Sequence, residues 1–150
     1  MRMATFTSHS PEETAALGEA WGRAASPAWL IGLSGDLGAG KTVLVAGLAR
    51  GLGVTARVAS PTFALLHEYQ GGRLPLSHLD LYRLESRAEI ISAGLEPYLC
   101  RPEGVVVVEW IERWFEGAPG TLVPGISLRR VEIKTTGVAE RIIHYEDFGG

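Results

Sequence analysis

The glycine-rich stretch GDLGAGKT, residues 35–42, constrains the fold of this chain more than any other part of the sequence. It places three glycines and a lysine directly after the apolar run 29–33. Glycine has no Cβ, so backbone N–H groups in such a loop can close around an anion, and a helix that begins there adds the positive end of its dipole. The match to G-x-x-x-x-G-K-[ST] at Gly35, Gly40, Lys41 and Thr42 therefore predicts a phosphate-binding loop between a strand and a helix. The alternative is a glycine-rich turn with a solvated lysine.

Both flanks of the loop have the composition that this prediction requires. Residues 28–34 are apolar and of strand length, and Pro27 ends the element before them. Residues 41–50 are rich in apolar side chains, and Gly51 and Gly53 suit the end of a helix. A strand before the loop and a helix after it are thus expected.

A further helix is expected before the loop, over residues 10–25. Ser10, Pro11 and Glu13 form the pattern of a capping box, with proline at the first helical position. Apolar residues recur at helical spacing and predict one core-facing side, made of Leu17, Ala20, Trp21 and Ala24.

Beyond the loop, strand and helix patterns alternate. The expected elements are an antiparallel hairpin of residues 63–69 and 74–79, one helix or two short ones in residues 84–99, a strand at residues 105–110, and a second hairpin of residues 126–134 and 140–145. Gly94 is the point at which the helical segment would break. The sequence VVVVEW indicates a central strand that is buried on both faces. We therefore predict an α/β fold of three layers with a mixed, partly antiparallel central sheet, in one domain over residues 1–150.

The composition excludes several classes of protein. With 150 residues, 46% of them hydrophobic and 21% charged, the chain has the balance of a globular domain. A domain of this size buries roughly 70% of the surface that its unfolded form exposes. The net charge of −3 supplies no basic field for autonomous binding of nucleic acid, so contact with RNA would need a partner.

The sequence also predicts the compartment. Cys100 is the only cysteine, which excludes an internal disulfide, and a small buried apolar residue is favoured there over a catalytic thiol. The N-terminus lacks the apolar core of a secretory signal, and no run approaches the ~20 apolar residues that span a bilayer. We expect a cytoplasmic protein without a membrane partner.

The loop prediction gives each of its residues a chemical task. The backbone of residues 37–42 would hold the α- and β-phosphates, Lys41 would reach the β- and γ-phosphates, and the Thr42 hydroxyl would bind Mg²⁺. Mg²⁺ on phosphates also needs carboxylates nearby. Glu109 and Asp80 each end a strand-like segment, where parallel strands face a ligand crevice. The alternative for each is a surface or loop acid.

Ser60-Pro61-Thr62-Phe63 follows the loop at a distance where phosphate-loop proteins often present a threonine to the γ-phosphate. By spacing alone, an ordinary turn initiated by Ser-Pro is an equal alternative.

Four motifs, taken together, resemble those of the TsaE family, the ATPase subunit of bacterial tRNA threonylcarbamoyladenosine synthesis. They are GDLGAGKT, SPTF (residues 60–63), HLDLYR (residues 78–83) and EW-x-E (residues 109–112). The resemblance covers most of the chain, but it is loose from residue 115 onward and supports no assignment of particular residues there.

The resemblance implies a P-loop NTPase-like fold, ATP and Mg²⁺ as ligands, and slow ATP hydrolysis by the chain alone. It also implies two partner proteins, TsaB and TsaD, of which TsaD carries the transfer chemistry. The product would be threonylcarbamoyl-adenosine beside the anticodon of tRNAs that read codons beginning with A. The chain would contact tRNA only indirectly, through the complex.

By motif, the resemblance implies functional roles for thirteen residues. Asp80 and Lys41 would be catalytic, and Thr42 and Glu109 would hold the metal. Nucleotide binding would fall to Gly35, Asp36, Leu37, Gly38, Ala39, Gly40, Lys41, Thr42, Val43, Thr62, which senses the γ-phosphate, and Trp110.

Several roles stay open at this point. Asp80 would orient the attacking water or support Mg²⁺. His78 would order the loop around Asp80 or act in catalysis. Arg83 is the nearest candidate for an arginine finger, although a structural ion pair is favoured for it, and Trp114 and Phe115 favour core packing over a partner-facing patch.

Two other functions compete with the ATPase. A small-molecule kinase would need an acceptor pocket and a closing lid, for which 150 residues leave little room. A nucleotide-binding interaction module would not hydrolyse ATP, and Asp80 argues against it.

Overall fold

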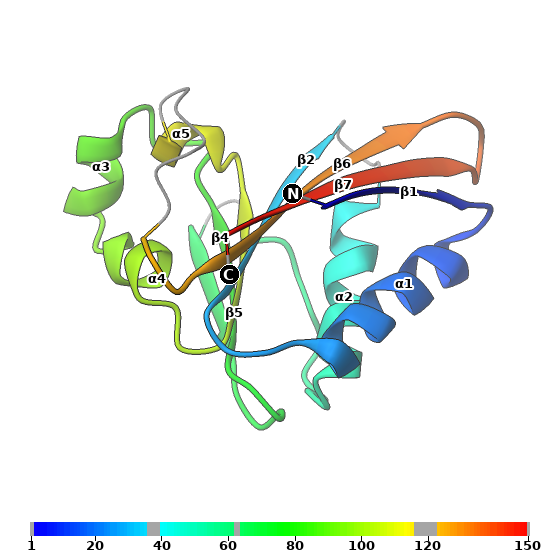
Figure 1. The fold of residues 1–150 in the computed structure, drawn as a ribbon, viewed down its shortest axis with the longest axis horizontal. Helices are drawn as coiled ribbons and strands as arrows, with labels where there is room; N and C mark the ends of the chain where they lie inside the picture. The colour runs from blue at the N-terminus through cyan, green and yellow to red at the C-terminus, as the bar shows by residue number, and fades with distance from the viewer. Residues whose placement is uncertain (1, 36–39, 62–63, 116–122, 150) are drawn as a thin grey trace.

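The computed structural model describes residues 2–35, 40–61, 64–115 and 123–149. Its elements in chain order are β1 (Arg2–Ser8), α1 (Pro11–Ala24), β2 (Trp29–Gly35), α2 (Lys41–Gly51), β3 (Leu66–Tyr69), β4 (Leu76–Asp80), α3 (Arg87–Ser92), α4 (Glu96–Cys100), β5 (Val105–Glu109), α5 (Glu112–Phe115), β6 (Ser127–Thr135) and β7 (Arg141–Gly149). Figure 1 shows α1 and α2 on one side of the sheet and α3, α4 and α5 on the other, so the expected three layers are present.

The sheet is mixed, as predicted, and its strands follow the order β1-β7-β6-β2-β5-β4-β3. Strand β2 runs parallel to both β5 and β6, and β5 runs parallel to β4. Strands β3, β7 and β1 pair antiparallel at the two ends. The carboxyl ends of β2, β5 and β4 therefore meet at one edge of the sheet, where α/β proteins bind their ligands.

Helices α1 and α2 pack against each other through glycines. A Cβ at Gly18 would lie 2.3 Å from the carbonyl oxygen of Leu44, and a Cβ at Gly22 would lie 2.3 Å from that of Leu48. Glycines of α2 face α1 in the same way, since a Cβ at Gly47 would lie 2.1 Å from the Ala15 carbonyl oxygen. Two helix backbones approach this closely only where side chains are absent.

This close contact corrects the predicted face of α1. Trp21 is buried as expected, at 7% exposure, but Ala20 and Ala24 are exposed, so the prediction is wrong for these two alanines. The buried residues of the helix are Thr14, Gly18, Trp21 and Gly22. The apolar periodicity could not identify Gly18 and Gly22, because the small size of glycine, and not hydrophobicity, accounts for their burial.

The two faces of the sheet carry separate apolar clusters, and the valines of β5 alternate between them. Val105 and Val107 join the cluster under α1 and α2, whereas Val106 and Val108 join the cluster under α3, α4 and α5. All four are nearly inaccessible to solvent, which confirms a central strand buried on both faces.

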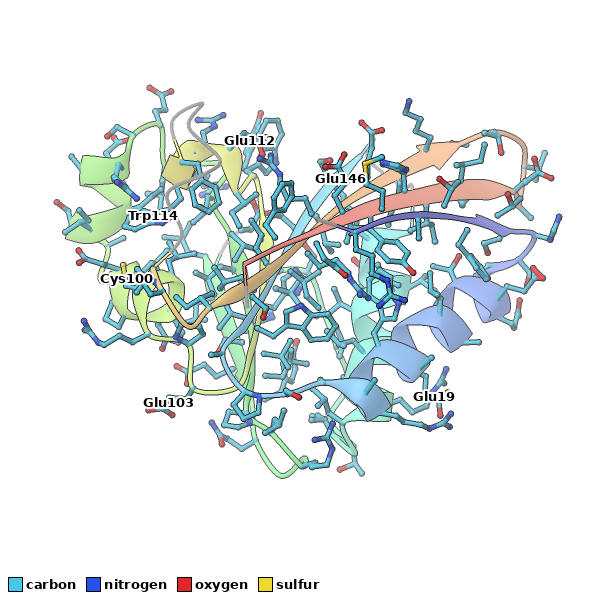
Figure 2. The ribbon with its side chains drawn as sticks, in the orientation of Figure 1. Glu19, Cys100, Glu103, Glu112, Trp114 and Glu146 are labelled. Carbon is cyan, nitrogen blue, oxygen red and sulfur yellow. The ribbon has the colours of Figure 1, made fainter. Side chains whose placement is uncertain are left out.

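The second cluster settles two further predictions. Trp114 and Phe115 are buried at 5% and 4% exposure, so core packing is confirmed. Figure 2 shows Trp114 and Cys100 on this side of the sheet, away from α1 and α2. Cys100 is half-buried against the cluster, and burial raises the pKa of its thiol, which suits a packing residue better than a nucleophile.

The helical segment after β4 is divided, and its break is at Gly94. This residue has φ +82°, a conformation that suits glycine and ends α3 before α4 begins. The predicted hairpins are present as β3–β4 and β6–β7. Strand β1, which pairs with β7 at the sheet edge, and the short helix α5 were not predicted. None of the helices in the described segments combines the length and apolarity that crossing a bilayer demands.

Candidate functional site

A pocket of about 690 Å³ lies at the edge where the parallel strands end. Strand β2 ends at Gly35, β4 at Asp80 and β5 at Glu109, and the first turn of α2 closes the pocket from the other side. Its described lining consists of Gly35, Gly40, Lys41, Thr42, Val43, Ser60, Asp80, Tyr82, Glu109 and Trp110. Eight of these residues are among the predicted site residues, although they come from distant parts of the sequence.

The remaining predicted residues lie outside the described part of the chain. They are Asp36, Leu37, Gly38, Ala39 and Thr62. Their assignment to nucleotide binding stays a prediction.

The two ends of the phosphate-loop stretch require glycine for separate reasons. Gly40 precedes α2 with φ +101°, a left-handed conformation that L-residues with side chains adopt at a cost. A Cβ at Gly35 would lie 2.4 Å from the carbonyl oxygen of Ile133 in β6. Helix α2 begins directly at Lys41, and its first turn lines the pocket, so the positive end of the helix dipole lies there.

The Lys41 ammonium lies between the end of β2 and the carboxylate of Glu109. Its Nζ donates to the carbonyl oxygen of Gly35 at 3.2 Å and lies 3.4 Å from Glu109 Oε1. The side chain is mostly buried, so this charge is weakly screened by water. An anionic ligand in the pocket would meet a cation that is already held in place.

Glu109 is a buried carboxylate with a partner on each oxygen. His78 Nε2 lies 2.9 Å from Oε2, and Lys41 lies beside Oε1. Burial is the largest single influence on the Glu109 pKa and raises it. The hydrogen bond from His78 and the charge of Lys41 together outweigh burial, so the pKa lies below its ordinary value and the group is ionised at neutral pH.

Asp80 lies directly opposite Glu109 in the register of β4 and β5, and it is 4% exposed. Its Oδ1 accepts a hydrogen bond from the backbone N–H of Tyr82 at 2.9 Å, which holds the carboxylate at the end of the strand. The surface-acid alternative is excluded for both carboxylates, because both are buried and line the pocket.

Trp110 follows β5 in a strained conformation, with φ +64°. Non-glycine residues rarely adopt this region, and such strain clusters at functional sites. The indole ring lies 5.2 Å from the ring of Tyr82, and the Arg113 guanidinium lies 5.2 Å from its centroid. The two aromatic rings form one wall of the pocket.

Sequence reasoning missed two residues of this site, Tyr82 and Ser60, which line the pocket. It singled out His78 but not the partner of its ring, Glu109. Each lies within a motif already singled out, so the motifs contained the signal. The contact between His78 and Glu109 depends on strand register, which the motifs do not contain.

Comparison with known proteins places the chain in a family. The family model for "Threonylcarbamoyl adenosine biosynthesis protein TsaE" matches residues 8–143. The chain is 38% identical over 149 residues to the tRNA threonylcarbamoyladenosine biosynthesis protein TsaE of Bacillus subtilis, a match that covers 99% of this chain and 89% of that protein. It is 50% identical over 105 residues to the TsaE protein of Nostoc sp., covering 68% of this chain and 64% of the Nostoc protein.

The fold has a solved counterpart. The crystal structure of Bacillus subtilis YdiB superposes with a TM-score of 0.77 at 34% sequence identity, and the match covers 99% of this chain and 87% of YdiB. The predicted P-loop NTPase-like fold is thus confirmed.

Proposed function

The chain belongs to the TsaE family, and on this premise we propose that it is the ATP-binding and ATP-hydrolysing subunit of tRNA threonylcarbamoyladenosine synthesis. In this proposal it acts in the cytoplasm with TsaB- and TsaD-like partners and resets their complex through ATP hydrolysis. The modified adenosine lies beside the anticodon of tRNAs that read codons beginning with A. The chain touches tRNA only through the complex.

One observation carries the proposal. Lys41, Asp80 and Glu109 come from three different elements, and all three line one pocket at the start of α2. A cation at a helix N-terminus suits terminal phosphates, and buried carboxylates opposite it suit a divalent cation. This combination is typical of a site that binds a nucleoside triphosphate together with Mg²⁺.

The donor set fits Mg²⁺, which prefers hard oxygen ligands and keeps several of its waters. Thr42 supplies a hydroxyl, and Glu109 and Asp80 supply carboxylates within the same lining. When bound, the ion neutralises charge on the phosphates. We assign Thr42 and Glu109 as the residues that hold it.

Different residues of the chain then bind the phosphates, orient the attacking water and exclude solvent. Lys41 attracts the β- and γ-phosphate oxygens, and Val43, Gly35 and Gly40 bound the space around them. Asp80 accepts a hydrogen bond from the attacking water and orients it, and Trp110 shields the pocket from solvent. We also predict nucleotide binding by residues 36–39 and by Thr62, which lie outside the described part of the chain.

The lining of the pocket explains why the rate of ATP hydrolysis would depend on partners. Among its described lining residues, the only cation is Lys41, and none is an arginine. Phosphoryl transfer is accelerated strongly when an arginine neutralises charge in the transition state. A chain that hydrolyses ATP slowly alone and faster in a complex is the expected behaviour.

The test is phosphate release from Mg·ATP, first with the chain alone and then with purified TsaB- and TsaD-like partners and tRNA. We expect slow release without any acceptor, acceleration by the partners, and modified tRNA only when this chain is present. Product that forms only with a small acceptor would instead indicate a kinase. ATP binding without any hydrolysis in the full mixture would indicate an interaction module.

A further inference from the structure

His78 lies at the centre of β4 and is completely buried. In the register of the sheet it is opposite Val107 of β5, and Glu109 follows two residues later on the same face. A diagonal neighbour at this spacing is within reach of a long side chain on the adjacent strand. The imidazole therefore points along the sheet toward the pocket edge, where β5 ends.

Within the described ranges of the chain, the His78 ring makes one hydrogen bond. Nε2 lies 2.9 Å from Glu109 Oε2, and a carboxylate can only accept, so Nε2 carries the hydrogen. Nδ1 is buried, and it has no hydrogen-bond partner in the part of the chain that the structure describes. A buried polar atom without a partner is destabilising, and an apolar side chain of similar size would avoid this cost.

Burial of the His78 ring is therefore unfavourable for packing, and what it provides is the hydrogen bond to Glu109. Glu109 has two oxygens, and the hydrogen bond from His78 ties Oε2 to the protein interior. This leaves Oε1 directed at Lys41, 3.4 Å from its ammonium. Without His78, the carboxylate could rotate and lose this alignment.

We propose that His78 is a positioning residue, whose Nε2–H holds one oxygen of Glu109 so that the other faces Lys41 and the metal–phosphate end of the pocket. This inference rests on the proposed function, since it concerns how the site receives a divalent cation with ATP. Hydrogen bonds that orient a metal-binding side chain typically change metal affinity by about 10–100-fold when they are removed. His78 has the same relation to Glu109.

The first test examines the contact itself in the full chain without nucleotide. Histidine ¹⁵N–¹H spectra report which ring nitrogen carries the hydrogen. We expect the Nε2–H form for His78, with a slowly exchanging proton that becomes fast-exchanging in Glu109→Ala and stays protected in Glu109→Gln, whose amide oxygen still accepts. An Nδ1–H form in the wild type overturns the proposal.

The second test measures Mn²⁺ binding by electron paramagnetic resonance with ATP present, and ATP binding separately in EDTA. We expect His78→Leu to weaken Mn²⁺ binding by about 10–100-fold and to leave metal-free ATP binding unchanged. His78→Gln keeps a donor near the Nε2 position and should restore most of the loss. Ser77→Ala is the matched control, since the next residue of β4 is also buried but faces the other side of the sheet.

The outcomes separate the two proposals. Mn²⁺ binding by His78→Leu at the wild-type level overturns the positioning role and leaves the proposed function intact. Equal weakening of metal-free ATP binding, without rescue by His78→Gln, shows a merely structural histidine and also overturns it. A wild-type chain that binds neither ATP nor Mn²⁺ overturns the proposed function, and this inference falls with it.

Discussion

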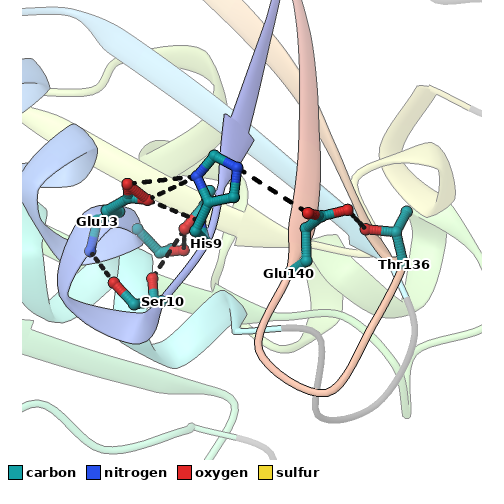
Figure 3. A network of polar contacts seen from close by, with 7 residues as sticks. His9, Ser10, Glu13, Thr136 and Glu140 are labelled. Atoms are coloured by element: carbon teal, nitrogen blue, oxygen red, sulfur yellow. Dashed lines mark hydrogen bonds and ion pairs between the residues drawn. The ribbon is translucent and has the colours of Figure 1, made fainter.

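Two polar clusters of this molecule place a histidine beside glutamate, and they differ in almost everything else. In the buried cluster, His78 and Lys41 flank Glu109 at the pocket. In the exposed cluster, His9 lies between Glu13 at the start of α1 and Glu140 before β7, as Figure 3 shows. The same residue types thus occur in two settings that differ in access to water.

Burial changes how strongly the same pairs of groups interact. The His78 side chain is fully buried, whereas that of His9 is 65% exposed, and the His9–Glu140 distance is 3.9 Å. Exposed pairs are screened by water and contribute little, whereas buried charges interact strongly and must be matched. We infer that the buried cluster controls the affinity for ligand, and that the exposed cluster stabilises the start of α1.

The largest expected effect tests the buried cluster at Lys41. Lys41→Ala removes the cation that we propose to face the phosphates and leaves Glu109 without its charged partner, so ATP affinity should fall by about two to three orders of magnitude. Isothermal titration calorimetry measures this directly. Arg50→Ala is the control, because Arg50 is a cation at the far end of the same helix and pairs with Glu19. Equal ATP affinity in wild type and Lys41→Ala would refute the phosphate-loop assignment.

A second large effect is expected at Asp80, on turnover instead of binding. Asp80→Asn keeps an oxygen that accepts from the Tyr82 N–H but removes the charge that would orient water. Loss of such a group typically costs about 10²–10⁴-fold in rate, and ATP affinity should stay near the wild-type value. Phosphate release under single-turnover conditions measures the rate. Undiminished hydrolysis would remove Asp80 from the catalytic residues.

The difference between the clusters also explains what the sequence could predict. The sequence predicted that Lys41, Asp80 and Glu109 lie close together, because a motif and two strand ends imply one edge of a parallel sheet, and all three line one pocket. The contact between His78 and Glu109 could not be identified, because it depends on a strand register that brings residues 31 positions apart together. Local patterns predict where a side chain emerges from its element but not which neighbour it meets.

The same limit applies to the fold. The central strands and α2 were predicted from short apolar runs and helix signals. Strand β1 was missed because it pairs with β7 from the opposite end of the chain and is largely exposed, with only Ser8 buried. The glycine face of α1 was missed because only the approach of α2 makes small size useful there.

A smaller effect is expected at Ser10, which belongs to the exposed cluster. Ser10 Oγ accepts a hydrogen bond from the Glu13 backbone N–H at 3.1 Å and caps α1, as predicted. Ser10→Ala should lower the free energy of unfolding by about 1 kcal/mol and leave ATP affinity unchanged. Urea denaturation measures the first quantity, with Ser26→Ala at an exposed position as the control. A change in ATP affinity would contradict the separation of the two clusters.

The smallest effect concerns Glu13, the second part of the cap. Its carboxylate accepts from the backbone N–H of His9 at 2.7 Å, one residue earlier than a capping box requires. This backbone hydrogen bond is the main reason that the Glu13 pKa lies below its ordinary value of 4.5. Because the folded pKa is the lower one, ionised Glu13 stabilises the fold above the unfolded pKa. That contribution disappears as the pH falls through the folded pKa.

Glu13→Gln should therefore lower the melting temperature slightly near pH 7 and not at all at the acidic end, so that the melting curves of wild type and variant converge as the pH falls through the folded pKa of Glu13. Differential scanning calorimetry between neutral and acidic pH gives both curves. Glu12→Gln is the matched control, since Glu12 is an exposed acid in the same helical turn. Curves that stay parallel for Glu13→Gln would show that the hydrogen bond from His9 does not depend on the charge of the carboxylate. The exposed histidine cluster would then stabilise α1 through uncharged capping alone.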